Sequence, residues 1–94
     1  MKILVLNPNT SRIVTDKVAG VVRRIANPDT EVVVLQPQHG PESLESFYDE
    51  ARVTPYTLEI VNQANLEGFD AVVLAAFCDP GLEALKEISN IQIG

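Results

Sequence analysis

The chain has 94 residues, of which 46% are hydrophobic, so we expect one small globular domain. It contains neither an apolar run long enough to cross a membrane nor an N-terminal segment typical of a secretory signal, which predicts a cytoplasmic protein. The formal net charge of −6 argues against binding to nucleic acid, whose phosphates are also negative. One cysteine excludes an internal disulfide, and one histidine leaves too few soft ligands for a transition-metal site.

Short apolar runs alternate with helical patterns along the chain. Runs typical of buried parallel strands lie at residues 2–6, 30–35 and 71–76, and a fourth strand begins at 91–93. Because strands and helices alternate, we predict an α/β fold with a four-stranded parallel sheet between two helical layers. Right-handed crossovers favour the flavodoxin-like strand order 2-1-3-4. Residues 1–94 are therefore expected to form a single lobe.

Apolar residues at helical spacing predict a first helix after the first strand. Thr10 or Ser11 can cap it, because a side-chain oxygen at this position accepts a bond from a free amide of the first turn. Pro28 disfavours helical geometry at the residue before it and ends the helix. The stripe expected to face the core comprises Val14, Val18, Val21 and Ile25.

Prolines mark the starts of two later helices. A short helix is expected over residues 42–52. A separate helix then starts with Thr54 as its N-cap and Pro55 at its first helical position. In the same way, the last helix starts with Asp79 as N-cap, followed by a proline. These signals predict four helical segments in total.

Ligands of open parallel sheets gather outside the carboxyl ends of the strands. In this chain those ends carry residues 7–10, 36–41 and 77–81. The chain contains no GxxxxGK[ST] loop and no GxGxxG after its first strand, so neither a P-loop nor a dinucleotide site is supported. The polar turn after the first strand and the cysteine-containing turn after the third therefore remain as candidates.

The first of these turns contains Asn7, Asn9, Thr10 and Ser11. Two explanations for these residues stay open. Their side chains can simply shape a turn and cap a helix. Alternatively, asparagine amides and helix N-terminal amides can bind a carboxylate or an amide carbonyl of a ligand.

Cys78 directly precedes the predicted N-cap of the last helix. A helix N-terminus stabilises a thiolate, which can act as a nucleophile or a base. The alternative is that Cys78 is a small buried hydrophobic residue, as most free cysteines are. His39 lies in a loop with glycine and proline, and we expect it to be a solvated surface residue.

Three segments together resemble one family. Residues 3–11 (ILVLNPNTS) are similar to the N-terminal signature of the aspartate/glutamate/hydantoin racemase family. Residues 40–45 (GPESLE), followed by 48–51 (YDEA), resemble its second signature, and residues 70–82 (DAVVLAAFCDPGL) resemble its third. The order and spacing of the segments also agree, and hydantoin and allantoin racemases form the most similar branch.

The resemblance implies an isomerase that uses no metal and no other cofactor. In this family two similar lobes each contribute one cysteine, and the two thiols act on opposite faces of the substrate's chiral carbon. The substrate implied is a small amino-acid derivative such as a hydantoin or an allantoin. The residues expected to contact it are Asn9, Thr10, Ser11, Ala76, Phe77, Cys78 and Asp79.

One departure from the family pattern concerns the cysteine. In the family it stands directly before the phenylalanine of the third signature, where this chain has Ala76. Cys78 lies two residues further on and is the candidate catalytic residue in its place. If the strand stays extended, the side chains at 76 and 78 share one face and lie about 6.6 Å apart.

A second departure is that the chain contains one lobe and ends where the family's second half would begin. An isolated lobe would expose an apolar face, so we expect a homodimer or a second lobe as partner.

Three functions follow from these observations. The first is a racemase-family lobe, inactive in isolation if the opposite cysteine is missing. The second is a non-catalytic lobe that binds a small molecule, with Ala76 marking lost catalysis. The third is half of a one-thiol lyase or isomerase in which the other lobe transfers the proton.

Overall fold

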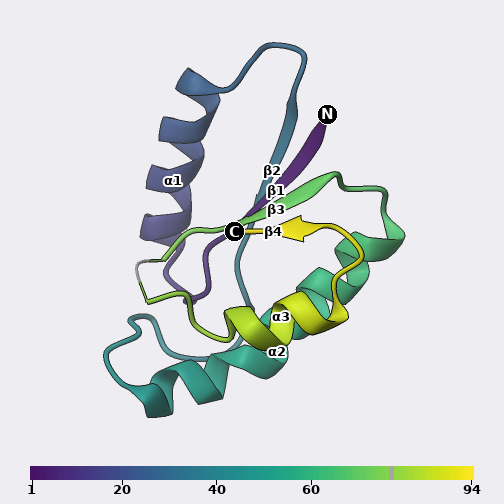
Figure 1. The fold of residues 1–94 in the computed structure, drawn as a ribbon. Coiled ribbons are helices and arrows are strands. Elements are labelled where there is room, and N and C mark those ends of the chain that lie inside the picture. The colour runs from purple at the N-terminus through teal and green to yellow at the C-terminus, as the bar shows by residue number, and fades with distance from the viewer. Residues whose placement is uncertain (77) are drawn as a thin grey trace.

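The computed structural model describes residues 1–76 and 78–94 and contains a parallel sheet between two helical layers (Figure 1). Its strands are β1 (Lys2–Leu6), β2 (Glu31–Leu35), β3 (Ala71–Leu74) and β4 (Gln92–Ile93). Helix α1 (Arg12–Ile25) covers one face, and α2 (Phe47–Leu66) and α3 (Leu82–Ile88) cover the other. The strand order is β2-β1-β3-β4, which confirms the predicted α/β fold and its order 2-1-3-4. Among the described residues, no helix combines the length and hydropathy that crossing a membrane requires.

Strand β1 lies between two parallel neighbours. Leu4 is in register with Val33 of β2 and Val72 of β3. Leu4 and Leu6 are fully buried, and Val5 on the opposite face is nearly so. A strand buried on both faces needs apolar residues at consecutive positions, which explains the continuous run in its sequence.

The main hydrophobic core lies between the sheet and helices α2 and α3. Its buried members include Leu4, Leu6, Val61, Ala64, Phe69, Val72, Leu74, Leu85 and Ile93. The face covered by α1 is less complete, since Val73 on the inner strand β3 is 45% exposed there. The sheet is therefore packed more tightly on one side than on the other.

The buried stripe of α1 differs from the predicted one. Val21 and Ile25 are 48% and 78% exposed, whereas Thr15 and Ala19 are buried. The prediction counted only large apolar residues, whereas the buried positions of this helix are a small alanine and a threonine that is hydrogen-bonded to Asn7 and Gln36. The capping prediction is confirmed for Ser11, whose side chain accepts a hydrogen bond at the helix start.

Helix α2 runs without interruption, so the two separate helices predicted over this segment are wrong. Its N-cap is Ser46, whose Oγ accepts a hydrogen bond from Asp49 N at 3.1 Å. Thr54 is not an N-cap, and Pro55 lies inside the helix rather than at its start. A proline after a threonine is a common start signal, but here a better cap exists eight residues earlier.

The helix tolerates Pro55 because both of its sides are anchored. Val53 and Thr57, on either side of the proline, are fully buried. The Thr54 hydroxyl donates to Glu50 O at 2.6 Å, and the Thr57 hydroxyl donates to Thr54 O at 3.0 Å. These contacts hold the backbone helical although the proline supplies no amide for its own hydrogen bond.

Replacing Pro55 by Ala restores the missing amide and removes the ring from the helix. We expect Pro55→Ala to raise the free energy of unfolding by about 1–3 kcal/mol, with part of the gain offset by a more flexible unfolded chain. Urea unfolding followed by circular dichroism measures the change. Pro28→Ala, in the loop after α1, is the control and should lower stability by less than about 1 kcal/mol. Lower stability of Pro55→Ala than of the unmodified chain would contradict this account.

Candidate functional site

The first strand-end turn is organised by Asn7, which is fully buried. Its backbone amide donates to Leu35 O at 2.9 Å and so extends the pairing of β1 with β2. Its side-chain Nδ2 donates to Asn9 Oδ1 at 3.0 Å and to Thr15 Oγ1 at 2.9 Å. One amide therefore holds together the end of the central strand, the turn and the first half of α1.

Asn9 and Ser11 complete this turn. Asn9 Oδ1 also accepts a bond from Ser11 N at 2.9 Å, and Ser11 Oγ accepts one from Val14 N at 3.3 Å. Turn shaping and helix capping are thus observed for these atoms. Among the described residues, Asn9 Nδ2 and the Ser11 hydroxyl proton have no acceptor, and both side chains are half-buried. Each can donate one bond to a ligand oxygen.

Thr10 connects this turn to the loop after β2. Its amide donates to Pro41 O at 3.0 Å, and its hydroxyl donates to Gly40 O at 3.2 Å. Gln36 Nε2 donates to Thr10 O at 2.9 Å, while Gln36 Oε1 accepts a bond from the Thr15 hydroxyl. Sequence reasoning missed the bridging role of Gln36, because no neighbouring residue distinguishes a glutamine that bridges two segments from an exposed one.

The chain turns earlier after β3 than predicted. The strand ends at Leu74, and the Ala75 amide adds one more bond to β1. The Ala76 amide then donates back to Leu74 O at 3.1 Å, which is the geometry of a tight turn. The predicted third strand over residues 71–76 is therefore two residues too long, and the condition that the strand stays extended to residue 76 is not met. Phe77, a predicted substrate contact, lies outside the described residues.

Helix α3 also starts later than predicted. Its N-cap is Gly81, which has φ of 69°, and not Asp79. Asp79 itself has φ of 46°, and its carbonyl accepts a bond from Leu82 N at 3.1 Å. Two left-handed residues close a turn here, so the proline does not begin the helix. Cys78 is three residues before the true N-cap, which removes the premise that it directly precedes the helix.

Gly81 fits because it has no side chain. A Cβ at this position would lie 2.8 Å from Thr54 Oγ1 and 2.9 Å from Thr54 Cγ2. The turn after β3 is therefore seated directly on α2, next to Pro55 and far from it in sequence. A glycine in the sequence can indicate a place where another segment comes close to the backbone. The sequence does not show that this segment is α2 at Thr54.

Cys78 lies exposed in a groove of about 430 Å³ against the start of α2. Of the two alternatives for Cys78, the small buried hydrophobic residue is therefore wrong. The groove is lined by Leu44, Glu45, Ser46, Phe47, Glu50 and Cys78. Phe47 is 90% exposed, so the rim offers an apolar surface beside two carboxylates. Among residues 1–76 and 78–94, no three His, Cys, Asp or Glu side chains gather as metal ligands would.

The family model described as Asp/Glu/Hydantoin racemase matches residues 3–93. The chain belongs to this family. The hydantoin racemases of Pseudomonas sp. (strain NS671) and Paenarthrobacter aurescens are each 40% identical to it, over 90 and 91 residues. The matches cover 96% of this chain but 36% and 39% of the two relatives, so the chain spans less than two fifths of their length.

Solved structures of the family agree with the fold. The allantoin racemase from Klebsiella pneumoniae superimposes with a TM-score of 0.93 at 37% identity, covering 100% of this chain and 39% of that one. The allantoin racemase from Pseudomonas fluorescens gives 0.88 at 35% identity, covering 99% and 39%. Both strand-end turns fall within the racemase-family match, whereas contact of Asn9, Thr10, Ser11, Ala76, Cys78 and Asp79 with a substrate stays a prediction.

The buried amide of Asn7 predicts a large cost for its removal. We expect Asn7→Ala to lower the free energy of unfolding by about 1–3 kcal/mol, because it leaves a void and buried groups without their partner. Asn27→Ala is the matched control: Asn27 Oδ1 accepts from Asp29 N at 2.9 Å in a similar turn, but the residue is exposed. Its loss should cost less than about 1 kcal/mol in the same urea titration. Equal costs at the two positions would contradict the central role of Asn7.

Alanine at three glycines separates backbone strain from steric contact. Gly81→Ala should lower the free energy of unfolding by at least about 2 kcal/mol, since it adds a clash with Thr54 to a left-handed backbone. Gly68 has φ of 78° with open space around it, so Gly68→Ala should lower the free energy of unfolding by about 1 kcal/mol. Gly20→Ala, inside α1 with no neighbour within 4 Å, should stabilise the chain by about 1 kcal/mol. A cost at Gly81 no larger than at Gly68 would disprove the contact.

Proposed function

We propose that this chain forms one half of a cofactor-independent racemase site for a hydantoin, an allantoin or a related amino-acid derivative. The observation that carries the proposal is the position of the two strand-end turns. Residues 7–11 follow β1, and residues 76 and 78–81 follow β3. Because these strands are adjacent and parallel, both turns lie at the carboxyl edge of the sheet. Both lie within the segment matched to the racemase family.

Racemisation at a carbon beside a carbonyl needs three things. A base removes the proton from one face, an acid returns a proton to the other face, and hydrogen bonds stabilise the negative charge on the carbonyl oxygen. In our proposal the free donors of Asn9 and Ser11 bind the polar edge of the substrate. The exposed thiol of Cys78 exchanges a proton on this side of the carbon.

The acid or base for the opposite face lies outside this lobe. When a thiolate takes the proton on one face and a thiol gives one on the other, the two groups exchange roles and no net proton is consumed. The relatives are more than twice as long as this chain, and we propose that a second lobe supplies the missing group. The activity of the complete site is therefore a property of two lobes.

A second function is supported by Ala76, which has no transferable proton at the family's cysteine position. In that case the lobe binds the small molecule without turning it over. In a third possibility, this lobe is half of a one-thiol lyase or isomerase, and the thiol of the other lobe performs the proton transfer.

Hydrogen–deuterium exchange tests one-sided proton transfer directly. We expect this chain in D₂O to exchange the hydrogen on the chiral carbon of a 5-substituted hydantoin faster than buffer, as measured by proton NMR, while optical rotation falls more slowly. Cys78→Ser should reduce the exchange rate by about 100-fold or more. Ala76→Cys should increase it, and Ala75→Cys is the matched control that should leave it unchanged.

The other outcomes distinguish the three functions. Exchange that is unaffected by Cys78→Ser would remove Cys78 from the mechanism. Chemical-shift changes of the chain on adding the hydantoin, without exchange or loss of rotation, would favour a binding lobe. If exchange and racemisation appear only when a relative's second lobe is added, and persist in Cys78→Ser, the one-thiol function is favoured.

A further inference from the structure

Strand β2 forms one edge of the sheet, and its outer side has no partner among the described residues. Its inner side pairs with β1: Glu31 N donates to Met1 O at 2.8 Å, and Leu35 O accepts from Asn7 N at 2.9 Å. Because backbone groups alternate in direction along a strand, those of residues 31, 33 and 35 face β1. The amides and carbonyls of Val32 and Val34 therefore face outward.

This edge lacks the features that usually prevent pairing. Natural edge strands are commonly very short, bulged, or protected by lysine or proline. Strand β2 pairs in unbroken register over five residues, Glu31 to Leu35, and contains neither proline nor lysine. Its one charge, on Glu31, is at the strand end and lies 3.8 Å from Lys2 Nζ. By contrast, β4 at the other edge has two residues.

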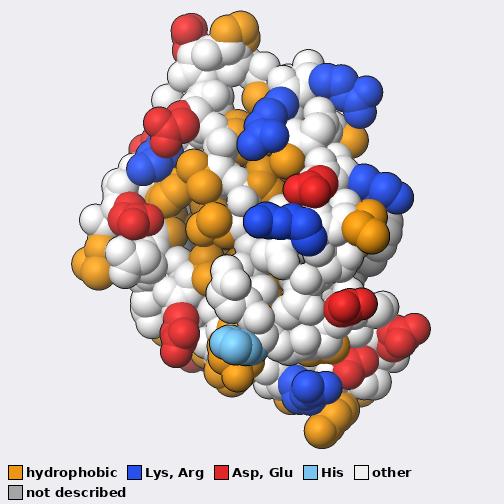
Figure 2. Space-filling model, turned by 180° about the vertical axis from the view of Figure 1, so that it is seen from behind, with side chains coloured by type: hydrophobic (Ala, Val, Ile, Leu, Met, Phe, Trp, Pro, Cys, Tyr) orange, Lys and Arg blue, Asp and Glu red, His pale blue; other side chains and the backbone are white. Residues whose placement is uncertain are grey.

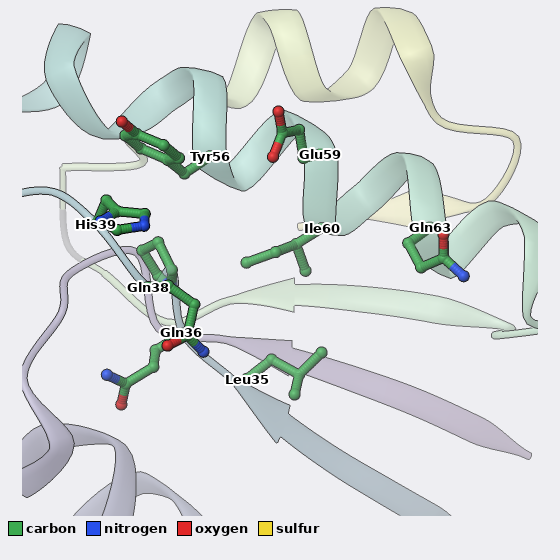
Figure 3. Close-up of a pocket in the computed structure, with 9 residues that line it drawn as sticks. Leu35, Gln36, Gln38, His39, Tyr56, Glu59, Ile60 and Gln63 are labelled. Atoms are coloured by element: carbon green, nitrogen blue, oxygen red, sulfur yellow. The ribbon is translucent and has the colours of Figure 1, made fainter.

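A groove lined by both apolar and polar side chains lies beside the outer edge. It has a volume of about 430 Å³ and runs between the end of β2 and helix α2. Figure 3 shows Leu35 and Ile60 pointing toward each other from these two elements, with Tyr56 and His39 at one end. Leu35 is 40% exposed there. In the view from behind, hydrophobic side chains gather in a hollow above the histidine (Figure 2).

We propose that two copies of this chain associate through antiparallel pairing of their β2 strands, centred on Val33. The outward groups are symmetrical about this residue, so Val32 of one copy pairs with Val34 of the other, and four hydrogen bonds form. The two sheets become one, and the groove beside α2 of each copy lies next to the Glu31 end of the other copy's β2. A strand of another protein would need outward amides and carbonyls at positions that match those of Val32 and Val34. A second copy of β2 has them at matching positions by symmetry.

The charges of β2 are compatible with this pairing. Glu31 of one copy lies opposite Leu35 of the other, so no carboxylate faces a carboxylate. The two Glu31 residues are four positions apart along the paired strands, a distance of about 14 Å. At physiological ionic strength this exceeds the screening length of about 8 Å. Pairing therefore costs little electrostatic energy at the strands, although the net charge of each chain is −6.

Light scattering after size exclusion, over a range of concentrations, measures the association. We expect a mass of twice the chain at high concentration. Val34→Pro removes an outward amide that has no partner in residues 1–76 and 78–94, so the fold tolerates it. It also eliminates two of the four bonds. Its dissociation constant should rise at least about tenfold. Val34→Thr keeps the amide and a similar shape, and it should associate as the unmodified chain does.

Disulfide trapping gives a second readout that does not depend on the proline variant. In the background Cys78→Ser, Val33→Cys places two thiols opposite each other, with Cα atoms about 4.5 Å apart, which suits a disulfide. Val32→Cys, in the same background, lies diagonally about 7–8 Å from its copy and points to the other face. Oxidation should link the first variant covalently into dimers and leave the second without a covalent link.

A monomeric mass at every concentration, together with no cross-link at position 33, overturns the proposal. A dimer that survives Val34→Pro and does not cross-link at position 33 uses another surface and overturns it as well. If Val34→Pro fails to fold, as judged by circular dichroism, the contrast between positions 33 and 32 decides alone. Loss of the proposed racemase function would leave this result unchanged, because no residue of β2 belongs to the proposed site.

Discussion

The central strand of this lobe ends inside the protein, and the amide of Asn7 makes that ending possible. A strand buried on both faces leaves polar backbone groups where it stops, and a buried polar group without a partner is costly. The backbone amide of Asn7 donates to Leu35 O, and its fully buried side chain donates to Asn9, to the Ser11 carbonyl and to Thr15. The start of α1 and the candidate ligand-binding turn are thereby fixed to the same strand.

A second constraint sets the position of the thiol. The turn after β3 rests on α2 because Gly81 has no side chain to meet Thr54. The same helix carries Phe47 and Glu50, which line the groove of Cys78, so the contact of Gly81 with Thr54 holds the turn against the helix that forms part of the groove wall. Pro55 lies next to this contact, inside a helix that continues on both sides of it between the buried residues Val53 and Thr57. The features that look like local irregularities in the sequence are thus joined in space.

Local signals predicted much of this fold, and tertiary contacts explain the failures. The run at residues 2–6 and the cap at Ser11 were correct because each depends on neighbouring residues. Pro55 misled because the same proline can begin a helix or lie within one, and burial on both sides decided the outcome. The start of α3 depends on left-handed Asp79 and Gly81, which act against a strong cap signal. The bridging role of Gln36 and the groove beside Cys78 join distant segments, so no local pattern revealed them.

The early turn at Ala76 changes how the missing family cysteine should be viewed. On an extended strand, moving a thiol from position 76 to 78 shifts it along one face and away from the reacting carbon. In this chain β3 ends at Leu74 and the Ala76 amide bonds back to Leu74 O, so the spacing of an extended strand no longer measures the displacement of the thiol. Whether a thiol at 78 serves the same carbon depends on the turn, and the turn is held by Gly81 against α2. In this lobe the position of the candidate catalytic group is consequently determined by a packing contact rather than by the strand that precedes it.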